Sequence, residues 1–110
     1  MLGRSERSDR RGKKPLAMEA ITAVGRPLAK KDHVKEIYLC GSYARGEADA
    51  QSDLDFLVFG GDGFHLTEIL ALGEELREVL QKEVDIFEIR EVNPDSDFYH
   101  TIMKEKVLVA

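Results

Sequence analysis

Apolar side chains recur with helical spacing in two long segments of the chain. Between about Phe64 and Lys82 they mark one face of an amphipathic helix, formed by Leu66, Ile69, Leu72, Leu76 and Leu80. The segment from Leu16 to Lys31 shows the same period, and we expect Gly25 and Pro27 to interrupt or kink that helix. The first of these helices should also carry an ion pair between Glu78 and Lys82, which stand four residues apart.

Four shorter segments have the length and the apolar character of strands. They are Val34–Cys40, Leu54–Phe59, Val84–Ile89 and a short last one at Val107–Val109. A turn of helix is expected at Tyr43–Gly46, and a helix capped by Ser96 or Asp95 at about 97–104. The alternation of helices and strands predicts an α/β or α+β domain built on a mixed β-sheet.

Composition and charge divide the chain into two parts. The chain has 110 residues and a net charge of −5. Residues 1–14 hold six Lys or Arg against two Asp or Glu, which gives +4 and leaves −9 for the other 96 residues. We expect a basic flexible tail at 1–14 and one domain at 15–110. The acidic domain is a poor candidate for nucleic-acid binding, which only the tail favours.

Other features of the composition exclude further classes of protein. No apolar run approaches the length of about 20 residues that spans a bilayer, and the N-terminus lacks the apolar core of a signal peptide. A single cysteine, Cys40, cannot form an internal disulfide framework and fits a reducing compartment. These observations favour a cytoplasmic protein with no membrane association.

Candidate chemistry is concentrated between Gly41 and Asp55, where the sequence reads GSYARGEADAQSDLD. Gly41 and Ser42 end a strand and can approach a phosphate closely. Asp53 and Asp55 would project from the same face of the next strand, because strand side chains alternate between faces. Two carboxylates so close repel each other unless a cation such as Mg²⁺ lies between them.

Asp85 is the candidate for a third carboxylate. It interrupts an otherwise apolar strand, where a charge is costly unless it is paired or bound to a metal. If this strand lies beside Leu54–Phe59, Asp85 can take a proton from an attacking hydroxyl or share a metal with Asp53 and Asp55. Glu88, three residues on, should point to the opposite face and is a weaker candidate.

The same residues also fit several other kinds of site in part. Gly41 and Gly46 have P-loop spacing, but Glu47 and Ala48 stand where a Walker motif needs Lys and Ser or Thr. The remaining spacings match neither an EF-hand nor a zinc site. A D-x-D pair alone is commonly a strand-entry turn, and Asp85 alone could protect an edge strand. Arg45 is equally compatible with a contact to a triphosphate and with an ordinary surface charge.

The pattern Gly41-Ser42, ten residues, then Asp53-Leu54-Asp55 resembles the minimal nucleotidyltransferase domains of the DNA polymerase β superfamily. The resemblance covers about residues 16–110, and Cys40 departs from it where an aromatic residue is common. It implies a mixed sheet with helices on one face and the active site on the other. It also implies Mg²⁺-dependent transfer of a nucleoside monophosphate from an NTP, through two Mg²⁺ ions.

The same resemblance implies a role for each candidate residue. Gly41 and Ser42 would contact the triphosphate, and Asp53, Asp55 and Asp85 would be the metal-binding and catalytic carboxylates. Arg45 stays a nucleotide-binding candidate on its position beside this loop. Stand-alone members this short resemble antitoxins that use ATP to adenylylate a tyrosine of a helical HEPN-type toxin.

Two alternatives to this function stay open at this point. One is a non-catalytic antitoxin that neutralises its partner by binding, and the other is modification of a small molecule such as an aminoglycoside. The latter enzymes usually carry a second domain, which 110 residues cannot hold. So small a domain would also gain from self-association into a homodimer.

Overall fold

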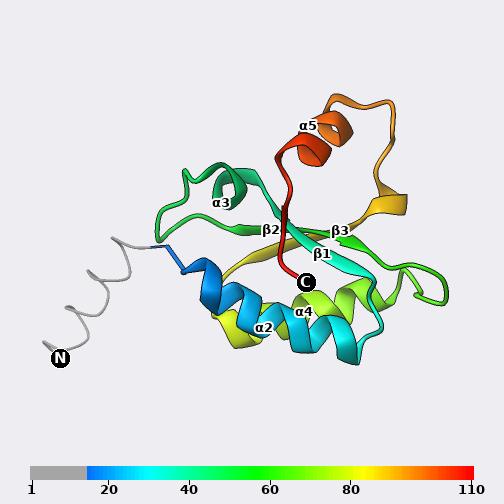
Figure 1. The fold of residues 1–110 in the computed structure, drawn as a ribbon, viewed down its shortest axis with the longest axis horizontal. Coiled ribbons are helices and arrows are strands. Elements are labelled where there is room, and N and C mark those ends of the chain that lie inside the picture. The colour runs from blue at the N-terminus through cyan, green and yellow to red at the C-terminus, as the bar shows by residue number, and fades with distance from the viewer. Residues whose placement is uncertain (1–14) are drawn as a thin grey trace, which may run out of the picture.

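A computed structural model describes residues 15–110, and the predicted basic tail at 1–14 lies outside the described residues. Figure 1 shows a sheet with helices packed above and below it. The elements in chain order are α2 (Met18–Lys31), β1 (Glu36–Cys40), α3 (Gly41–Arg45), β2 (Leu54–Phe59), α4 (Glu68–Leu80), β3 (Val84–Glu88), η1 (Ile89–Glu91), α5 (Asp97–Glu105) and β4 (Val107–Leu108). Within residues 15–110, no helix has both the length and the apolar composition that crossing a bilayer requires.

The four strands form one mixed sheet in the order β3-β2-β1-β4. β1 is antiparallel to both β2 and β4, whereas β2 and β3 run parallel through the crossover helix α4. This arrangement confirms the predicted mixed-sheet fold. It places β2 in the interior of the sheet and β3 at one edge.

The two faces of the sheet are covered by different helices. Leu54, Phe56 and Val58 of β2 belong to the main core, which α2 and α4 close from below in the view of Figure 1. Leu57 points to the opposite face and packs in a second cluster with Ile102 of α5. Helices therefore lie on both faces, in contrast to the expected one-sided layer, because α5 buries its own apolar residue against the second face.

Helix α2 is continuous through Pro27, contrary to the expected interruption. Pro27 has no N–H to donate to the carbonyl group of Ala23, four residues earlier. Both residues are exposed, so water can bind that carbonyl group instead. Gly25 is the position where the helix approaches Val109 after β4. A β-carbon at Gly25 would lie 2.6 Å from a Val109 methyl group, so no larger residue fits without displacement.

Helix α4 is shorter than the apolar pattern predicts. It begins at Glu68 rather than Phe64, because the preceding residues form a turn in which the His65 carbonyl oxygen accepts from the Glu68 N–H and the His65 N–H donates to the Glu68 carboxylate, both at 2.9 Å. It ends at Leu80, since Gln81 adopts the left-handed conformation. The expected Glu78–Lys82 pair is therefore wrong. Lys82 lies beyond the helix, and its ammonium group donates a hydrogen bond to the Ala50 carbonyl oxygen at 2.6 Å.

Glu88 is fully buried and points away from Asp85, as the alternation of strand side chains predicts. Its carboxylate accepts hydrogen bonds from the Gly60 N–H at 2.9 Å and from the Arg90 N–H at 2.7 Å. Burial alone would raise the pKa of Glu88, but these bonds and the Arg90 charge lower it below its usual value. Glu88 thus joins the end of β2 to the start of η1.

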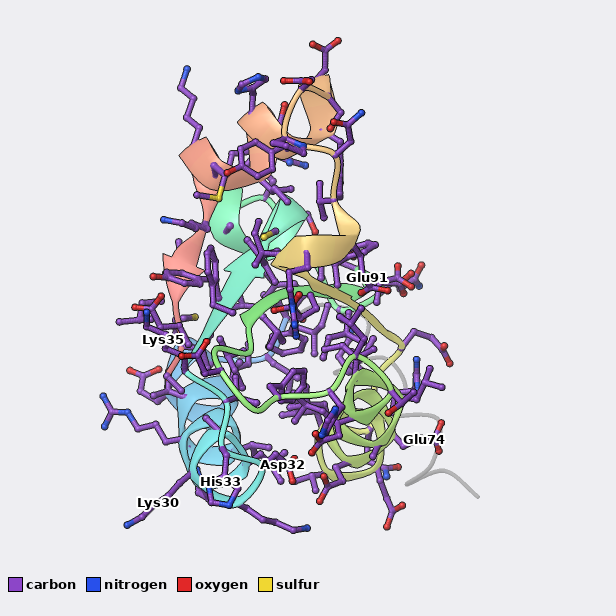
Figure 2. All side chains as sticks on the ribbon, turned by 90° about the vertical axis from the view of Figure 1, so that its right-hand side faces the viewer. Lys30, Asp32, His33, Lys35, Glu74 and Glu91 are labelled. Carbon is purple, nitrogen blue, oxygen red and sulfur yellow. The ribbon has the colours of Figure 1, made fainter. Side chains whose placement is uncertain are left out.

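Asp32 marks the end of α2, and Figure 2 shows it at the side of α2 that faces α4. One of its carboxylate oxygens is buried and finds no hydrogen-bond partner among residues 15–110. Burial raises the pKa of Asp32, and the nearby charges of Glu75 and Glu68 raise it further, against the opposing effect of Lys31.

We predict that Asp32→Asn increases the free energy of unfolding at pH 7. A carboxyl group with a raised pKa favours the folded state at low pH and loses that contribution as pH rises through its folded-state pKa. Removing a carboxylate from a helix C-terminus is also worth about 0.3–1 kcal/mol. Urea unfolding at pH 7 and pH 4 should show a gain that shrinks at the lower pH. The exposed Asp62→Asn is the control, and an equal or larger gain at pH 4 would contradict the prediction.

Candidate functional site

The parallel pairing of β2 with β3 brings two of the predicted carboxylates side by side. Asp55 of β2 stands opposite Asp85 of β3 in the sheet register. Asp53 precedes Asp55 by two residues, just before the strand begins. The predicted adjacency of the Asp85 strand to Leu54–Phe59 is therefore confirmed, and the side chains at 55 and 85 share the face opposite α2 and α4.

The electrostatics of Asp55 reflect this crowding. Burial raises the pKa of the Asp55 carboxyl group, and the charges of Asp85 and Asp53 raise it further. The Arg45 guanidinium is near enough to pull the pKa in the opposite direction. A half-buried carboxylate destabilised by two others is a site that a cation would stabilise.

Gly41 is required by geometry at the junction of β1 and α3. It has a φ of 66°, which favours glycine, and it lies directly against Asp55. A β-carbon at this position would stand 2.3 Å from Asp55 Oδ2, which is closer than real contacts allow. The backbone of residue 41 can therefore approach the carboxylate site only because no side chain intervenes.

The short helix α3 places the other candidate residues at the same end of the sheet. Ser42 follows Gly41, and its carbonyl oxygen accepts a hydrogen bond from the Glu47 N–H at 2.9 Å. The Tyr43 hydroxyl accepts a hydrogen bond from the Leu16 N–H at 3.1 Å, so this ring has a structural partner. Tyr43 thereby ties α3 to the segment that enters α2.

Arg45 is engaged in ion pairs within the described part of the chain. Its guanidinium donates to Glu47 at 2.9 Å and to Glu105 of α5 at 3.2 Å, with the side chain 40% exposed. An incoming phosphate would have to compete with these carboxylates for Arg45. The pair with Glu105 also connects α3 to α5 across the site face.

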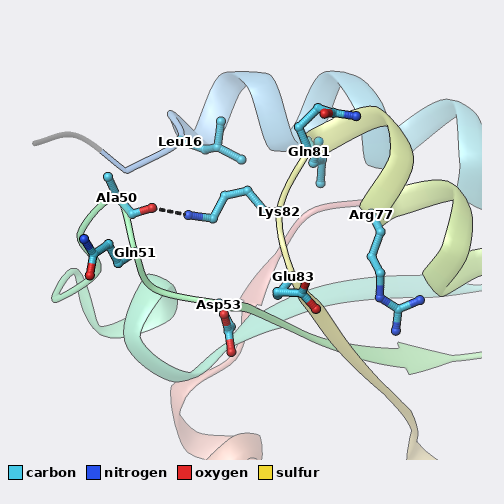
Figure 3. Close-up of a pocket in the computed structure, with 9 residues that line it drawn as sticks. Leu16, Ala50, Gln51, Asp53, Arg77, Gln81, Lys82 and Glu83 are labelled. Carbon is cyan, nitrogen blue, oxygen red and sulfur yellow. Dashed lines mark hydrogen bonds between the residues drawn. The ribbon is translucent and has the colours of Figure 1, made fainter. Parts of the chain in front are cut away.

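The loop before Asp53 is held by contacts that the sequence pattern did not reveal. The Ser52 hydroxyl accepts a hydrogen bond from the Asp49 N–H at 2.9 Å, and Asp49 Oδ1 accepts from the Gln51 N–H at 2.8 Å. Figure 3 shows Lys82 reaching across to the Ala50 carbonyl group from the start of β3. Residues with no obvious chemical motif thus fix the position of Asp53, and only a short-range turn signal at Asp49–Ser52 could have indicated it.

A pocket of about 610 Å³ opens beside Asp53 (Figure 3). Its lining combines two leucines with amide and charged side chains, and consists of Leu16, Ala50, Gln51, Asp53, Arg77, Leu80, Gln81, Lys82 and Glu83. Asp53 thus connects the carboxylate site with a cavity on the helix-covered side of the same sheet end.

Residues 15–110 contain no group of three or more His, Cys, Asp or Glu side chains already arranged to hold a metal ion. The donor set itself suits Mg²⁺, because this ion is commonly bound through one or two carboxylates while water and substrate phosphates complete its octahedron. The raised pKa of Asp55 supports the same fit, since a divalent cation would offset the repulsion that causes it. Asp53, Asp55 and Asp85 are the residues that would hold such an ion.

Cys40 contributes no nucleophile to this site. It is buried, and burial together with the charges of Asp55 and Glu105 raises the pKa of its thiol to about 11. A thiol in that state is almost entirely protonated at neutral pH, so Cys40 serves as a small apolar residue.

Comparisons of the sequence with a family model and with known proteins agree on one family. A family model described as "Polymerase beta, Nucleotidyltransferase" matches residues 24–110. Protein adenylyltransferase MntA of Thermococcus cleftensis is 34% identical over 89 residues, which are 81% of this chain and 88% of the relative. A Methanocaldococcus jannaschii protein, designated as a proposed protein adenylyltransferase, is 38% identical over 82 residues, 74% of this chain and 81% of the relative.

A solved structure shows the same fold at lower sequence identity. It is a complex of the tri-AMPylated HEPN toxin of Shewanella oneidensis with MNT antitoxin. One of its chains superimposes with a TM-score of 0.65 at 18% identity, covering 86% of this chain and 72% of that one. Together with the family match over most of the sequence, these findings show that the chain belongs to the polymerase β nucleotidyltransferase family.

Proposed function

We propose that this protein is a Mg²⁺-dependent protein adenylyltransferase that transfers AMP from ATP to a tyrosine hydroxyl of a HEPN-type toxin and so acts as its antitoxin. The observation that carries the proposal is the register of β2 and β3, which sets Asp55 beside Asp85, with Gly41 against Asp55. The names of the two relatives support the reaction. The HEPN–MNT complex that shares the fold supports the partner.

The reaction requires one bond to form and one to break at the α-phosphorus of ATP. The acceptor oxygen attacks this phosphorus, and the bond to the oxygen that bridges the α- and β-phosphates breaks. Pyrophosphate leaves with the electron pair of that bond, and the proton of the acceptor hydroxyl passes to Asp85. Asp53 and Asp55 would hold Mg²⁺, which would supply positive charge to the transferring and leaving groups.

The backbone around Gly41 and Ser42 supplies the surface for the triphosphate. Because Gly41 has no side chain, a phosphate can approach the main chain at the end of β1. Arg45 can also bind the triphosphate. To do so, its guanidinium gives up its ion pair with Glu47 or Glu105 and donates to a phosphate oxygen instead. The nucleotide then lies across the ends of β1 and β2.

We predict that Asp53→Asn combined with Asp55→Asn reduces AMP transfer by about 100-fold or more, because the cation loses its carboxylate ligands. The measurement is transfer of label from α-labelled ATP, with Mg²⁺, to a purified HEPN-type toxin. Asp62→Asn, a change of the same kind on an exposed loop, should transfer at the wild-type rate. Equal labelling by the double variant and the wild type would refute the assignment of these residues.

Gly41→Ala should abolish transfer, since a methyl group at residue 41 collides with Asp55. The positive φ adds a loss of about 1–2 kcal/mol in the free energy of unfolding. Gly63→Ala is the matched control, because Gly63 also has a positive φ but has nothing within 4 Å of the added carbon. Gly63→Ala should lose only the stability that the positive φ costs and Gly41→Ala at least as much in urea unfolding, while only Gly41→Ala loses labelling. Labelling by Gly41→Ala at the wild-type rate would contradict the prediction, because it would show that the site tolerates a side chain at residue 41.

Neutralisation by binding alone is the second candidate function. Exposed apolar side chains on α5 and β4, such as Phe98 and Leu108, favour a protein partner that covers them. In cells that express the toxin, we expect Asp53→Asn/Asp55→Asn to lose protection while the variant still co-purifies with the toxin. Full protection by this catalytically inactive variant would instead establish the binding function.

A further inference from the structure

Two phenylalanine rings meet on the site face of the sheet, one from β3 and one from α5. The rings of Phe87 and Phe98 have centroids 5.4 Å apart and an interplanar angle of 72°, an edge-to-face pair. Phe98 is the second residue of α5 and is 46% exposed, whereas Phe87 packs partly into the second cluster. We call Phe87 and Phe98 the aromatic platform.

Single exposed apolar residues are common, so the exposure of Phe98 alone does not indicate a binding site. The position of the platform beside Asp85 does. Phe87 follows Asp85 by two residues on β3, so the two side chains point to the same face. Their backbone positions are separated by about 6.6 Å along the strand. An aromatic group lying on the platform would therefore reach the carboxylate with a substituent at its ring edge.

The sheet order separates the platform from the triphosphate surface. Gly41 and Ser42 follow β1, whereas the platform lies on β3, and β2 stands between them. β1 and β3 are about 9–10 Å apart, so the platform lies on the side of Asp55 that is remote from Gly41 and Ser42. β3 is also the edge strand on this side, and a protein segment can approach it without displacing another strand.

We propose that the aromatic platform binds the ring of the acceptor tyrosine and makes Phe98 a specificity-determining residue. This inference rests on the proposed adenylyl transfer. The ring packs against Phe98 and directs its hydroxyl group toward Asp85. The phenolic oxygen then forms the bond to the α-phosphorus, its proton passes to Asp85, and pyrophosphate departs. The platform favours a phenol over the aliphatic hydroxyl of serine or threonine, because those side chains cannot fill the aromatic contact.

The kinetic test uses Phe98→Ala, which should raise the KM for the HEPN-type acceptor about tenfold because an aromatic contact is lost. The KM for ATP should stay within about twofold of wild type, and Phe98→Tyr, which keeps a ring, should restore acceptor binding. Leu70→Ala on α4 is the matched control, since Leu70 is 72% exposed and belongs to the other layer. Thermal unfolding by circular dichroism verifies that each variant is folded.

Several outcomes would overturn the proposal. A rise in the KM for ATP with Phe98→Ala would assign the ring to the nucleobase. An unchanged KM for both substrates would assign it no role. An equal loss for the native acceptor and for one whose tyrosine is replaced by threonine would show a general docking contact without selection of a phenol.

A binding measurement separates this proposal from the proposed function. With Mg²⁺ and α,β-methylene-ATP present, in which the bond that breaks is replaced by a stable P–C–P bridge, N-acetyltyrosinamide should produce saturable changes in the NMR signals of the Phe87 and Phe98 rings. N-acetylserinamide should produce none. This result does not depend on turnover, so absent AMP transfer with intact ring shifts would refute only the reaction. Absent or identical shifts for the two compounds would refute the platform.

Discussion

The parallel pairing of β2 with β3 imposes the constraint on which the rest of the site depends, because it forces Asp55 and Asp85 into adjacent positions. Sheet pairing is stabilised by the core on the other face, where the side chains of Leu54, Phe56 and Val58 are buried by α2 and α4. The apolar face therefore supplies the free energy that holds two like charges together. The packing of the sheet itself therefore holds Asp55 and Asp85 side by side.

The segments around Asp55 and Asp85 are each fixed in place by specific contacts. Gly41 brings the main chain against Asp55, and the turn at Asp49–Ser52 with Lys82 fixes the loop that carries Asp53. α5 closes part of the same face and brings Phe98 onto Phe87. In the proposed function, the surfaces for the nucleotide and the acceptor flank the carboxylates on opposite sides.

Period and spacing were sufficient to predict most of the fold and the candidate carboxylates. The strands, the mixed sheet and the adjacency of Asp85 followed from patterns within single segments and from one assumed strand pairing. The errors arose where distant contacts decide the outcome. Pro27 is a separate case, tolerated because its helix face is exposed to water. Lys82, in contrast, bonds a loop 32 residues away rather than Glu78, and α5 packs on the site face. No local pattern contains these long-range contacts, and the ion pair of Arg45 with Glu105 is of the same kind.

The close approach of Gly25 to Val109 has a consequence for how the protein is made. Val109 is buried, and residues 109 and 110 exchange backbone hydrogen bonds with Ile37. The layer between α2 and β1 therefore lacks part of its packing until residue 110 has emerged from the ribosome. Until then a nascent chain presents an incomplete sheet edge at β1, and the domain completes its packing only after residues 109 and 110 are outside the ribosome.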